Sequence, residues 1–175
     1  LSACHVITLQ ADGRILFGGW FSSYNGTPRN NLVRVHANGT VDNTFNIGTG
    51  FSSSISLRGI LIQPNDQIIA MGNFLTYNGT PKAMGVRLDP NGALDPDFDC
   101  GTGVNTGLQC TQLLANGGIL IGGRFTHFNG IGRNRIARLH NDFATPVGEV
   151  MAPGLAAYPS PSTGRFTLAS AIRDP

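Results

Sequence analysis

Short runs of apolar residues alternate with polar turns along the first 140 residues, and no helical period appears among them. Typical runs are VITLQ before Asp12-Gly13, RILFGGWF after it, and NLVRVH before Asn38-Gly39. Asp-Gly and Asn-Gly supply the positive φ angles of two-residue hairpin turns, so each turn predicts a pair of antiparallel strands. The pattern therefore predicts an all-β protein.

The turn dipeptides recur at regular intervals of 25 to 27 residues. They lie at Asp12-Gly13, Asn38-Gly39, Asn65-Asp66, Asn91-Gly92 and Asn116-Gly117. Because each turn joins two strands, a segment of about fifty residues contains two hairpins, or four strands.

A longer repeat contains these turns. The stretch GGWFSSYNG at 18–26 returns as MGNFLTYNG at 71–79 and as GGRFTHFNG at 122–130. The third copy keeps ILIGGRFTHFNG but loses its closing segment after Phe143. We therefore divide the propeller-like region, 1–143, into repeats at about 1–51, 52–104 and 105–143.

Four antiparallel strands in each repeat of about fifty residues are typical of a propeller blade. The predicted fold is an all-β, β-propeller-like array of about three four-stranded blades, followed by a short C-terminal β segment. Closed propellers carry four to eight blades. We therefore expect this chain to be a C-terminal fragment of a larger propeller; a ring completed by several chains and an open stack are the alternatives.

The nine-residue motif is interpreted first as a packing and turn device. Its glycine pairs at 18–19 and 122–123, and Met71-Gly72 in the second copy, would allow close approach of the inner strand. Phe21, Phe74 and Phe125 would fill the space between blades. The alternative is a ligand-contact loop in three copies, and the candidate residues are then Tyr24, Asn25, Tyr77, Asn78, Phe128 and Asn129.

The charge distribution excludes some partners. Twelve Lys and Arg residues stand against ten Asp and Glu, for a net charge of +2, and they are spread thinly. No basic cluster is present that would hold a phosphate backbone, so nucleic acid is not an expected partner. No apolar run reaches the roughly 20 residues of a transmembrane segment.

The three cysteines, Cys4, Cys100 and Cys110, have no zinc-binding spacing. Buried or free thiols are the preferred interpretation, and a local Cys100–Cys110 disulfide, which requires an oxidising compartment, is the alternative.

Candidate chemistry is sparse. The sequence contains no nucleophile elbow, metalloprotease motif or phosphate-binding loop, so we expect no enzyme, no catalytic residue and no cofactor. Asp95, Asp97 and Asp99 alternate and could offer oxygen ligands to calcium. The sister copy reads Asp42, Thr44 and Asn46, so capping of turns by the side chains is the better explanation, and no metal is expected.

The repeats also resemble a known family. The pattern QADGRILFGGWFSSYNG, followed by NLVRVHANGTVDNTFNIGTG, is similar to the bacterial delta-60 repeat, a domain of unknown function regarded as β-propeller-like. The resemblance covers residues 5–143. It implies a propeller fold and a secreted or cell-surface protein, and it implies no particular activity.

The tail resembles a second family. ATPVGEVMAPGLA is typical of a linker, placed at 144–157, and AYPSPSTGRFTLASAI follows it. The residues at 158–175 look like the start of the C-terminal sorting domain of type IX secretion cargo in Bacteroidota. The matching positions are Tyr158, Pro159, Pro161, Gly164 and Phe166. This resemblance implies export through the type IX translocon at the outer membrane. An ordinary proline-rich linker leading into one more strand is the alternative.

Together these features predict a non-enzymatic secreted or outer-membrane surface-attached propeller that serves as a binding, adhesion or scaffold module. Its expected partners are the type IX translocon and either a polysaccharide or another surface protein. The alternative is an accessory binding module of a larger secreted enzyme that degrades carbohydrate or protein.

Overall fold

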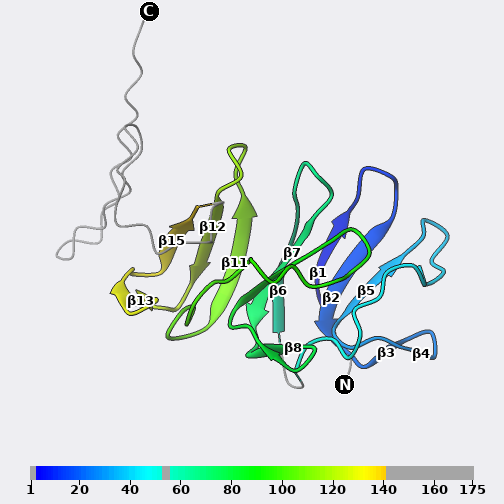
Figure 1. Cartoon of the computed structure of the whole chain (residues 1–175), viewed down its shortest axis with the longest axis horizontal. Helices are drawn as coiled ribbons and strands as arrows, with labels where there is room; N and C mark the ends of the chain where they lie inside the picture. The colour runs from blue at the N-terminus through cyan, green and yellow to red at the C-terminus, as the bar shows by residue number, and fades with distance from the viewer. Residues whose placement is uncertain (1–2, 53–55, 141–175) are drawn as a thin grey trace, which may run out of the picture. The chain divides into compact units, whose positions relative to one another are not determined.

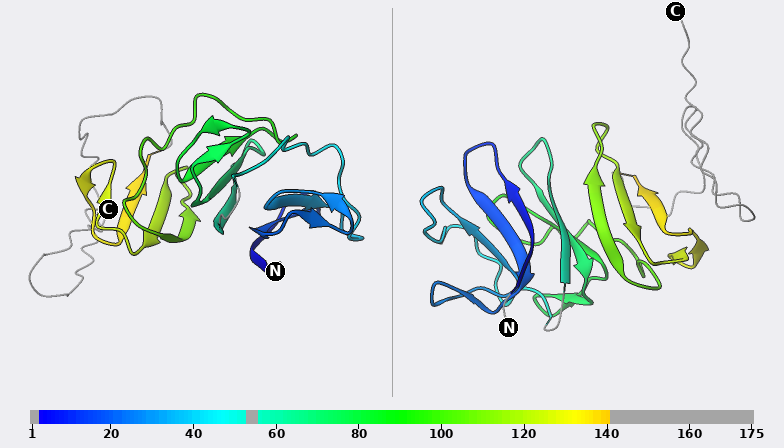
Figure 2. Two further views of the ribbon diagram at one scale, coloured as in Figure 1. Left: turned by 90° about the horizontal axis from the view of Figure 1, so that it is seen from below. Right: turned by 180° about the vertical axis from the view of Figure 1, so that it is seen from behind.

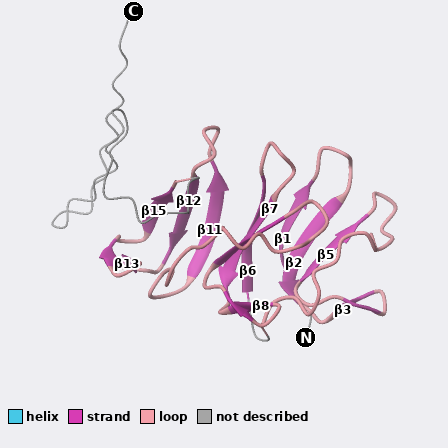
Figure 3. Ribbon diagram, in the orientation of Figure 1, coloured by secondary structure: helices cyan, strands magenta, loops and turns pink. Residues whose placement is uncertain are grey.

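The computed structural model describes residues 3–52 and 56–140, which belong to the first of two units of the chain, Leu1–Ala144. These residues form fifteen strands and no helix (Figure 3), and so confirm the all-β fold. Accordingly, no helix that could cross a membrane occurs in this part of the chain. The predicted linker at 144–157 and the sorting segment at 158–175 lie outside the described residues.

Each repeat forms one three-stranded antiparallel sheet in which the second strand is central. The strands of the first sheet are β1 (Ala3–Leu9), β2 (Ile15–Trp20) and β5 (Leu32–Val35). Those of the second are β6 (Ser56–Ile62), β7 (Ile68–Asn73) and β10 (Gly85–Leu88). Those of the third are β11 (Leu108–Leu113), β12 (Ile119–Gly123) and β15 (Ile136–Leu139).

Along the chain, a separate small hairpin connects the second and third strands of every sheet. The hairpins pair β3 (Ser23–Tyr24) with β4 (Thr27–Pro28), β8 (Thr76–Tyr77) with β9 (Thr80–Pro81), and β13 (His127–Phe128) with β14 (Ile131–Gly132). Each hairpin closes on a two-residue Asn-Gly turn with both residues at positive φ, as Asn25 (45°) and Gly26 (76°) are. This backbone matches the primed turns that such hairpins prefer.

The larger turns differ from the prediction of two-residue loops. Leu9 pairs with Ile15, and the Gln10 amide donates to the Arg14 carbonyl, which leaves a three-residue loop. In this loop only Gly13 has a positive φ, 82°. Asp12 instead accepts a hydrogen bond from the Arg14 amide at 2.9 Å, so its side chain caps the turn.

The predicted fourth strand of each blade is wrong. In the first and second repeats it is reduced to one isolated bridge, Val35–Val41 and Leu88–Leu94 respectively. Directly after Val41, the Asp42 carboxylate accepts the Thr44 amide at 2.9 Å, which turns the chain out of the strand. Asp95 does the same to the Asp97 amide at 3.0 Å, and Asp99 caps the Gly101 amide. The capping role expected of these aspartates is therefore confirmed, although they do not alternate along a strand.

The closing segment of each repeat continues to the next repeat. Phe51 forms a bridge with Tyr77 in β8, and Val104 forms one with Phe128 in β13. The small hairpins of the second and third repeats are thus each joined to the end of the preceding repeat.

The three sheets lie face to face in chain order, as the two views of Figure 2 show. The strands β1 and β2 contact β6, and β11 contacts β6 and β7. The first strands of neighbouring sheets therefore contact each other, in the fanned arrangement expected of propeller blades (Figure 1).

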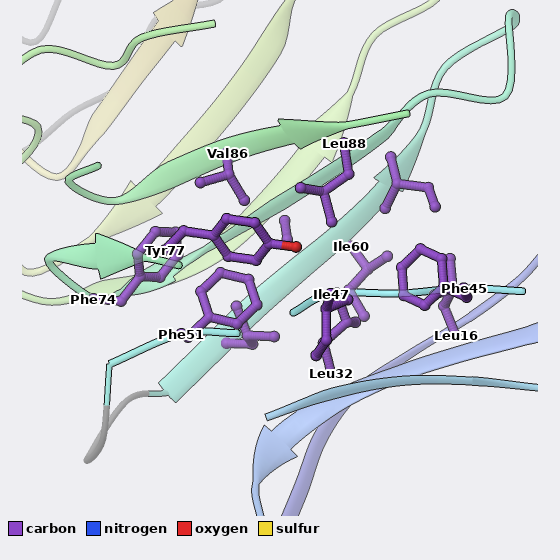
Figure 4. Close-up of a cluster of buried hydrophobic side chains, with 13 residues drawn as sticks. Leu16, Leu32, Phe45, Ile47, Phe51, Ile60, Phe74, Tyr77, Val86 and Leu88 are labelled. Carbon is purple, nitrogen blue, oxygen red and sulfur yellow. The ribbon is translucent and has the colours of Figure 1, made fainter. Parts of the chain in front are cut away.

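Apolar side chains fill the space between neighbouring sheets. Leu16, Leu32 and Phe45 of the first repeat pack with Ile60 and Val86 of the second, as Figure 4 shows. A second cluster joins the second repeat to the third and includes Met71, Phe98 and Phe125. Phe74 and Phe125 fill inter-sheet space as predicted. Phe21 lies instead with Val33 and Val35 in a third cluster, on the other face of the first sheet.

The glycine pairs have two different uses. A Cβ on Gly18 would lie 2.7 Å from Cδ1 of Leu57 in the next repeat, so this glycine permits the predicted approach between blades. A Cβ on Gly19 would instead overlap the Ala3 carbonyl oxygen within the same sheet. The register of β1 and β2 shifts at this point, between Cys4 and Val6. The second glycine therefore accommodates a β-bulge, where strands approach closely.

Candidate functional site

The predicted ligand residues all lie in the three small hairpins, at equivalent positions. The aromatic residues Tyr24, Tyr77 and Phe128 end β3, β8 and β13, and each is followed by the turn asparagine. Figure 1 shows the three hairpins along its lower side, at the same end of successive sheets. The structure therefore places all six residues at one edge of the array.

The aromatic side chains at this edge contact the protein. Tyr77 is fully buried, and its hydroxyl donates to the Gly92 carbonyl at 3.0 Å. Burial raises the pKa of Tyr77 well above its ordinary value. Tyr24 makes the equivalent bond to the Gly39 carbonyl at 3.1 Å, and Phe128 packs against the second cluster. Each of these rings therefore anchors its small hairpin to the rest of the protein.

The turn asparagines connect consecutive repeats. Oδ1 of Asn78 accepts the Gly50 amide at 3.0 Å and the Thr49 hydroxyl at 3.1 Å, both from the closing loop of the first repeat. Asn129 accepts the Gly103 amide at 2.9 Å in the same way. No such side-chain bond is present for Asn25 among the described residues. These contacts are structural, and a ligand role for the six residues stays a prediction.

Other residues at the same edge are exposed and apolar. Trp20, Leu75 and Ile131 are 46%, 74% and 58% exposed, and one comes from each repeat. We call the end of the three sheets at which these residues and the small hairpins lie the hairpin edge. The equivalent positions in the other repeats hold polar residues: Asn73 and Arg124 for Trp20, Ser22 and Thr126 for Leu75, Thr27 and Thr80 for Ile131.

Sequence reasoning missed these residues because it followed what the repeats share. The sequence does carry a signal for these residues: each is apolar at a position that is polar in the other two repeats. These three exposed apolar side chains, one in or next to each small hairpin, are therefore the candidate contact residues.

An ion pair is the main charged feature between the repeats. Nε of Arg34 lies 2.8 Å from Oδ2 of Asp42, and both side chains are about 1–2% exposed. The Arg34 guanidinium also donates to the Pro90 carbonyl of the second repeat at 2.5 Å and lies over the Phe45 ring, 4.7 Å from its centroid. The charge is thus satisfied by a carboxylate, a carbonyl and an aromatic face.

The second repeat contains the same arrangement at the same spacing. Arg87 pairs with Asp95, eight residues later, at 2.8 Å, and stacks on Phe98 at 5.3 Å. Here the two side chains are 19% and 17% exposed. Arg138 occupies the equivalent place in the third repeat, where it is exposed and has no acidic partner among the described residues.

Titration of these aspartates follows from their contacts. Burial alone would raise the pKa of Asp42, but hydrogen bonds from Thr44 and Arg14 and the charge of Arg34 lower it well below its ordinary value. The pKa of Asp95 is lowered, against burial, by Arg87 and the Asp97 amide. Both carboxylates are held ionised by the fold, in structural roles.

The cysteines are free thiols in the structure. Cys100 is buried, which raises the pKa of its thiol to about 12, while Cys4 and Cys110 are exposed. Within 3–52 and 56–140, no group of three or more His, Cys, Asp or Glu residues is arranged to hold a metal ion.

Comparison with known proteins identifies the repeats. A family model described as "Domain of unknown function (DUF5122) beta-propeller" matches residues 10–45, 63–98 and 114–142, one segment in each repeat. No curated protein and no solved structure matches the chain. The three matched segments cover more than half of the sequence, and each contains the second and third strands of one sheet, so this chain belongs to the DUF5122 beta-propeller family.

Proposed function

We propose that this protein is a non-enzymatic binding module that acts outside the cell and contacts its ligand through the hairpin edge. The observation that carries the proposal is the position of Trp20, Leu75 and Ile131. Each is an exposed apolar residue at a site where the sister repeats are polar. The repeated residues build the scaffold, and these three differ from one repeat to the next.

The chemistry of the edge favours a polysaccharide or the surface of another protein. Trp20 offers a large, amphipathic ring that contributes area at low entropic cost, as the anchors of binding surfaces do. Arg124 and His127 of the third repeat are also exposed and supply hydrogen-bond donors. The ionised aspartates and the buried tyrosine described above are committed to the fold, which supports a binding role in place of a catalytic one.

Replacing Trp20 with alanine is expected to weaken binding about tenfold, because an aromatic anchor residue contributes more than 1 kcal/mol. The measurement is retention of the purified chain on insoluble polysaccharides, such as chitin and β-glucan, with depletion isotherms. His36→Ala is the matched control, since His36 is exposed at the opposite end of the first sheet. Equal affinities for wild type and the Trp20 variant on every retained polymer would place the ligand elsewhere.

The tail supports export as type IX secretion cargo of a Bacteroidota cell. The proposal rests on the order Tyr158, Pro159, Pro161, Gly164 and Phe166 after a linker of small residues. The final location is then the extracellular medium or the outer-membrane surface, and the translocon is a partner.

Trimming the chain after Asp142 is expected to abolish export while the repeats still fold. The measurement is immunodetection of the product in medium, outer membrane and periplasm of a Bacteroidota host that carries a type IX system. A Ser160→Asn variant serves as the control and is expected to export normally, because the sorting domains that the tail resembles usually have asparagine where this chain has Ser160. Export of the trimmed chain at the wild-type level would refute the sorting role.

A second candidate is an accessory module of a secreted enzyme that degrades carbohydrate or protein. The same hairpin edge would then bring a separate catalytic domain to its substrate. The reading frame upstream of Leu1 distinguishes the two: a hydrolase or lyase domain there supports the accessory role, and further repeats support the binding and scaffold role.

A further inference from the structure

The first sheet has one face that no other repeat covers among the described residues. On this face Phe21 and Val33 are buried by side chains of their own repeat, including Tyr24, whereas Ile7 and Leu9 of β1 are 68% and 70% exposed. The equivalents of Ile7 and Val33 in the second sheet, Ile60 and Val86, are buried against the first repeat. We call this surface the first-repeat face. Its residues are of the kind that pack between sheets elsewhere in the chain, but no neighbouring sheet covers them.

The third sheet carries the complementary surface. Leu120, Ile136 and Arg138 are equivalent to Leu16, Leu32 and Arg34, which pack the first repeat against the second. Ile136 is 40% exposed, and Arg138 is exposed as well. We call this surface the third-repeat face. The chain therefore presents both halves of its own repeated interface.

We propose that the third-repeat face of one copy of this chain binds the first-repeat face of a second copy. The contact continues the interface that already joins the repeats within one chain, and it is heterologous, since two different surfaces meet. Two copies supply six sheets, which lies within the four to eight blades of closed propellers. A head-to-tail pair can thus close, with two equivalent interfaces. This inference is independent of the proposed function.

Polar groups on the two faces match. Inside one chain, Arg34 donates to the Pro90 carbonyl of the following repeat. Arg138 is the equivalent of Arg34, and Ala37 is the equivalent of Pro90 in the first repeat. The geometry of the internal interface therefore pairs the unpartnered guanidinium of Arg138 in one copy with the Ala37 carbonyl of the other.

An aromatic substitution also favours a second copy as the occupant. Phe51, from the end of the first repeat, stacks edge-on with Phe74 and Tyr77 of the second, at 4.7 and 4.9 Å. The third repeat has lost the segment that would supply such a residue. The first-repeat face carries its own: Phe17, where the second repeat has Ala70, contacts Phe21 and Tyr24 at 5.8 and 5.1 Å. It is therefore suited to a partner that lacks the closing aromatic.

The test is the oligomeric state of the full 175-residue chain, measured by sedimentation velocity over a concentration series. We expect a dimer with a dissociation constant in the micromolar range. Leu9→Glu on one face and Arg138→Glu on the other are each expected to raise that constant at least about tenfold. Leu75→Glu is the matched control, because Leu75 is equally exposed but lies at the hairpin edge.

A mixture of the two face variants distinguishes this arrangement from a symmetric one. The Leu9→Glu copy keeps an intact third-repeat face, and the Arg138→Glu copy keeps an intact first-repeat face. One native interface forms in the mixed pair, so the mixture is expected to dimerise more tightly than either variant alone. Circular dichroism melts confirm that all variants fold.

Three results would overturn the proposal. One is a monomer at every concentration up to about 100 μM, which would leave the first-repeat face to another occupant, such as a further repeat. Another is a dimer that both face variants retain. The third is a mixture no tighter than its components, which would indicate an isologous contact.

Discussion

Replacing Asp42 with alanine is expected to destabilise the three-repeat unit by about 3–5 kcal/mol, because the change leaves a buried charge without its partner. Arg34 is 1% exposed and would keep only the Pro90 carbonyl, the Thr44 hydroxyl and the Phe45 ring. The side chain of Arg34 is among the largest fully buried side chains of the described residues. The measurement is urea unfolding followed by circular dichroism at pH 7.

The second repeat provides an internal control for this prediction. Asp95→Ala removes the same partner from Arg87, but that pair is nearly a fifth exposed and water can replace the carboxylate. Its expected cost is about 1–2 kcal/mol. Equal losses in the two variants would contradict the role of burial.

The same pair predicts how stability depends on pH. The pKa of Asp42 is lower in the folded protein than its ordinary value. The stability that it confers is therefore complete above a pH of about 4 and is lost as the pH falls further. The Asp42 variant should show a shallower loss of stability than wild type over this acidic range.

Gly72→Ala is the second change with a large expected effect, a loss of about 3 kcal/mol. A Cβ at this position would overlap the carbonyl oxygen of Ser56 and would lie 2.8 Å from the Leu57 Cα. Both neighbours are backbone atoms of the adjacent strand, where the register shifts between Leu57 and Gly59. The side chain therefore cannot be accommodated without breaking the bulge.

Two other glycines separate this overlap from ordinary glycine effects. Gly132 has an open surrounding and an ordinary φ, so Gly132→Ala is expected to change stability by less than about 0.5 kcal/mol. Gly79 is equally open but has a φ of +74°, so Gly79→Ala should cost about 1 kcal/mol from backbone strain alone. Thermal and urea unfolding of the three variants should give that ranking. A neutral Gly72 variant would show that the bulge can relax.

The repeat itself made most of the fold predictable. Asn25-Gly26 and its two copies were expected to be turns, and they are, because few residues adopt consecutive positive φ angles; the short strands that pair on either side of them were not predicted. The apolar runs on either side of Asp12-Gly13 gave β1 and β2 correctly. These features depend on local sequence, and three independent copies made each pattern stronger.

The fourth strand was not predictable by the same means. The segments around Asp42 and Asp95 alternate like strands, yet their carboxylates are bound to Arg34 and Arg87, eight residues earlier. This tertiary contact combines with local capping of Thr44 and Asp97 to override the strand propensity. The second use of the glycines escaped prediction for a related reason, since a register shift depends on both strands.

The candidate surface was only partly predictable. Tyr77 and Asn78 drew attention because they repeat, and the structure shows both engaged with neighbouring parts of the chain. Trp20, Leu75 and Ile131 are each unique to one copy, so a search for shared motifs passes over them. In a repeat protein, features common to all copies tend to report on the scaffold.

The closing loop of one repeat ends on the hairpin of the next, through the Phe51–Tyr77 bridge and the bond from the Gly50 amide to Asn78. A gene duplication whose breakpoints fall within that loop would therefore give each new copy a ready attachment on both sides. Breakpoints between a closing loop and the small hairpin that it contacts would separate the two parts of this junction. The array can thus lengthen or shorten in whole units of about fifty residues, and this junction sets where recombination is tolerated.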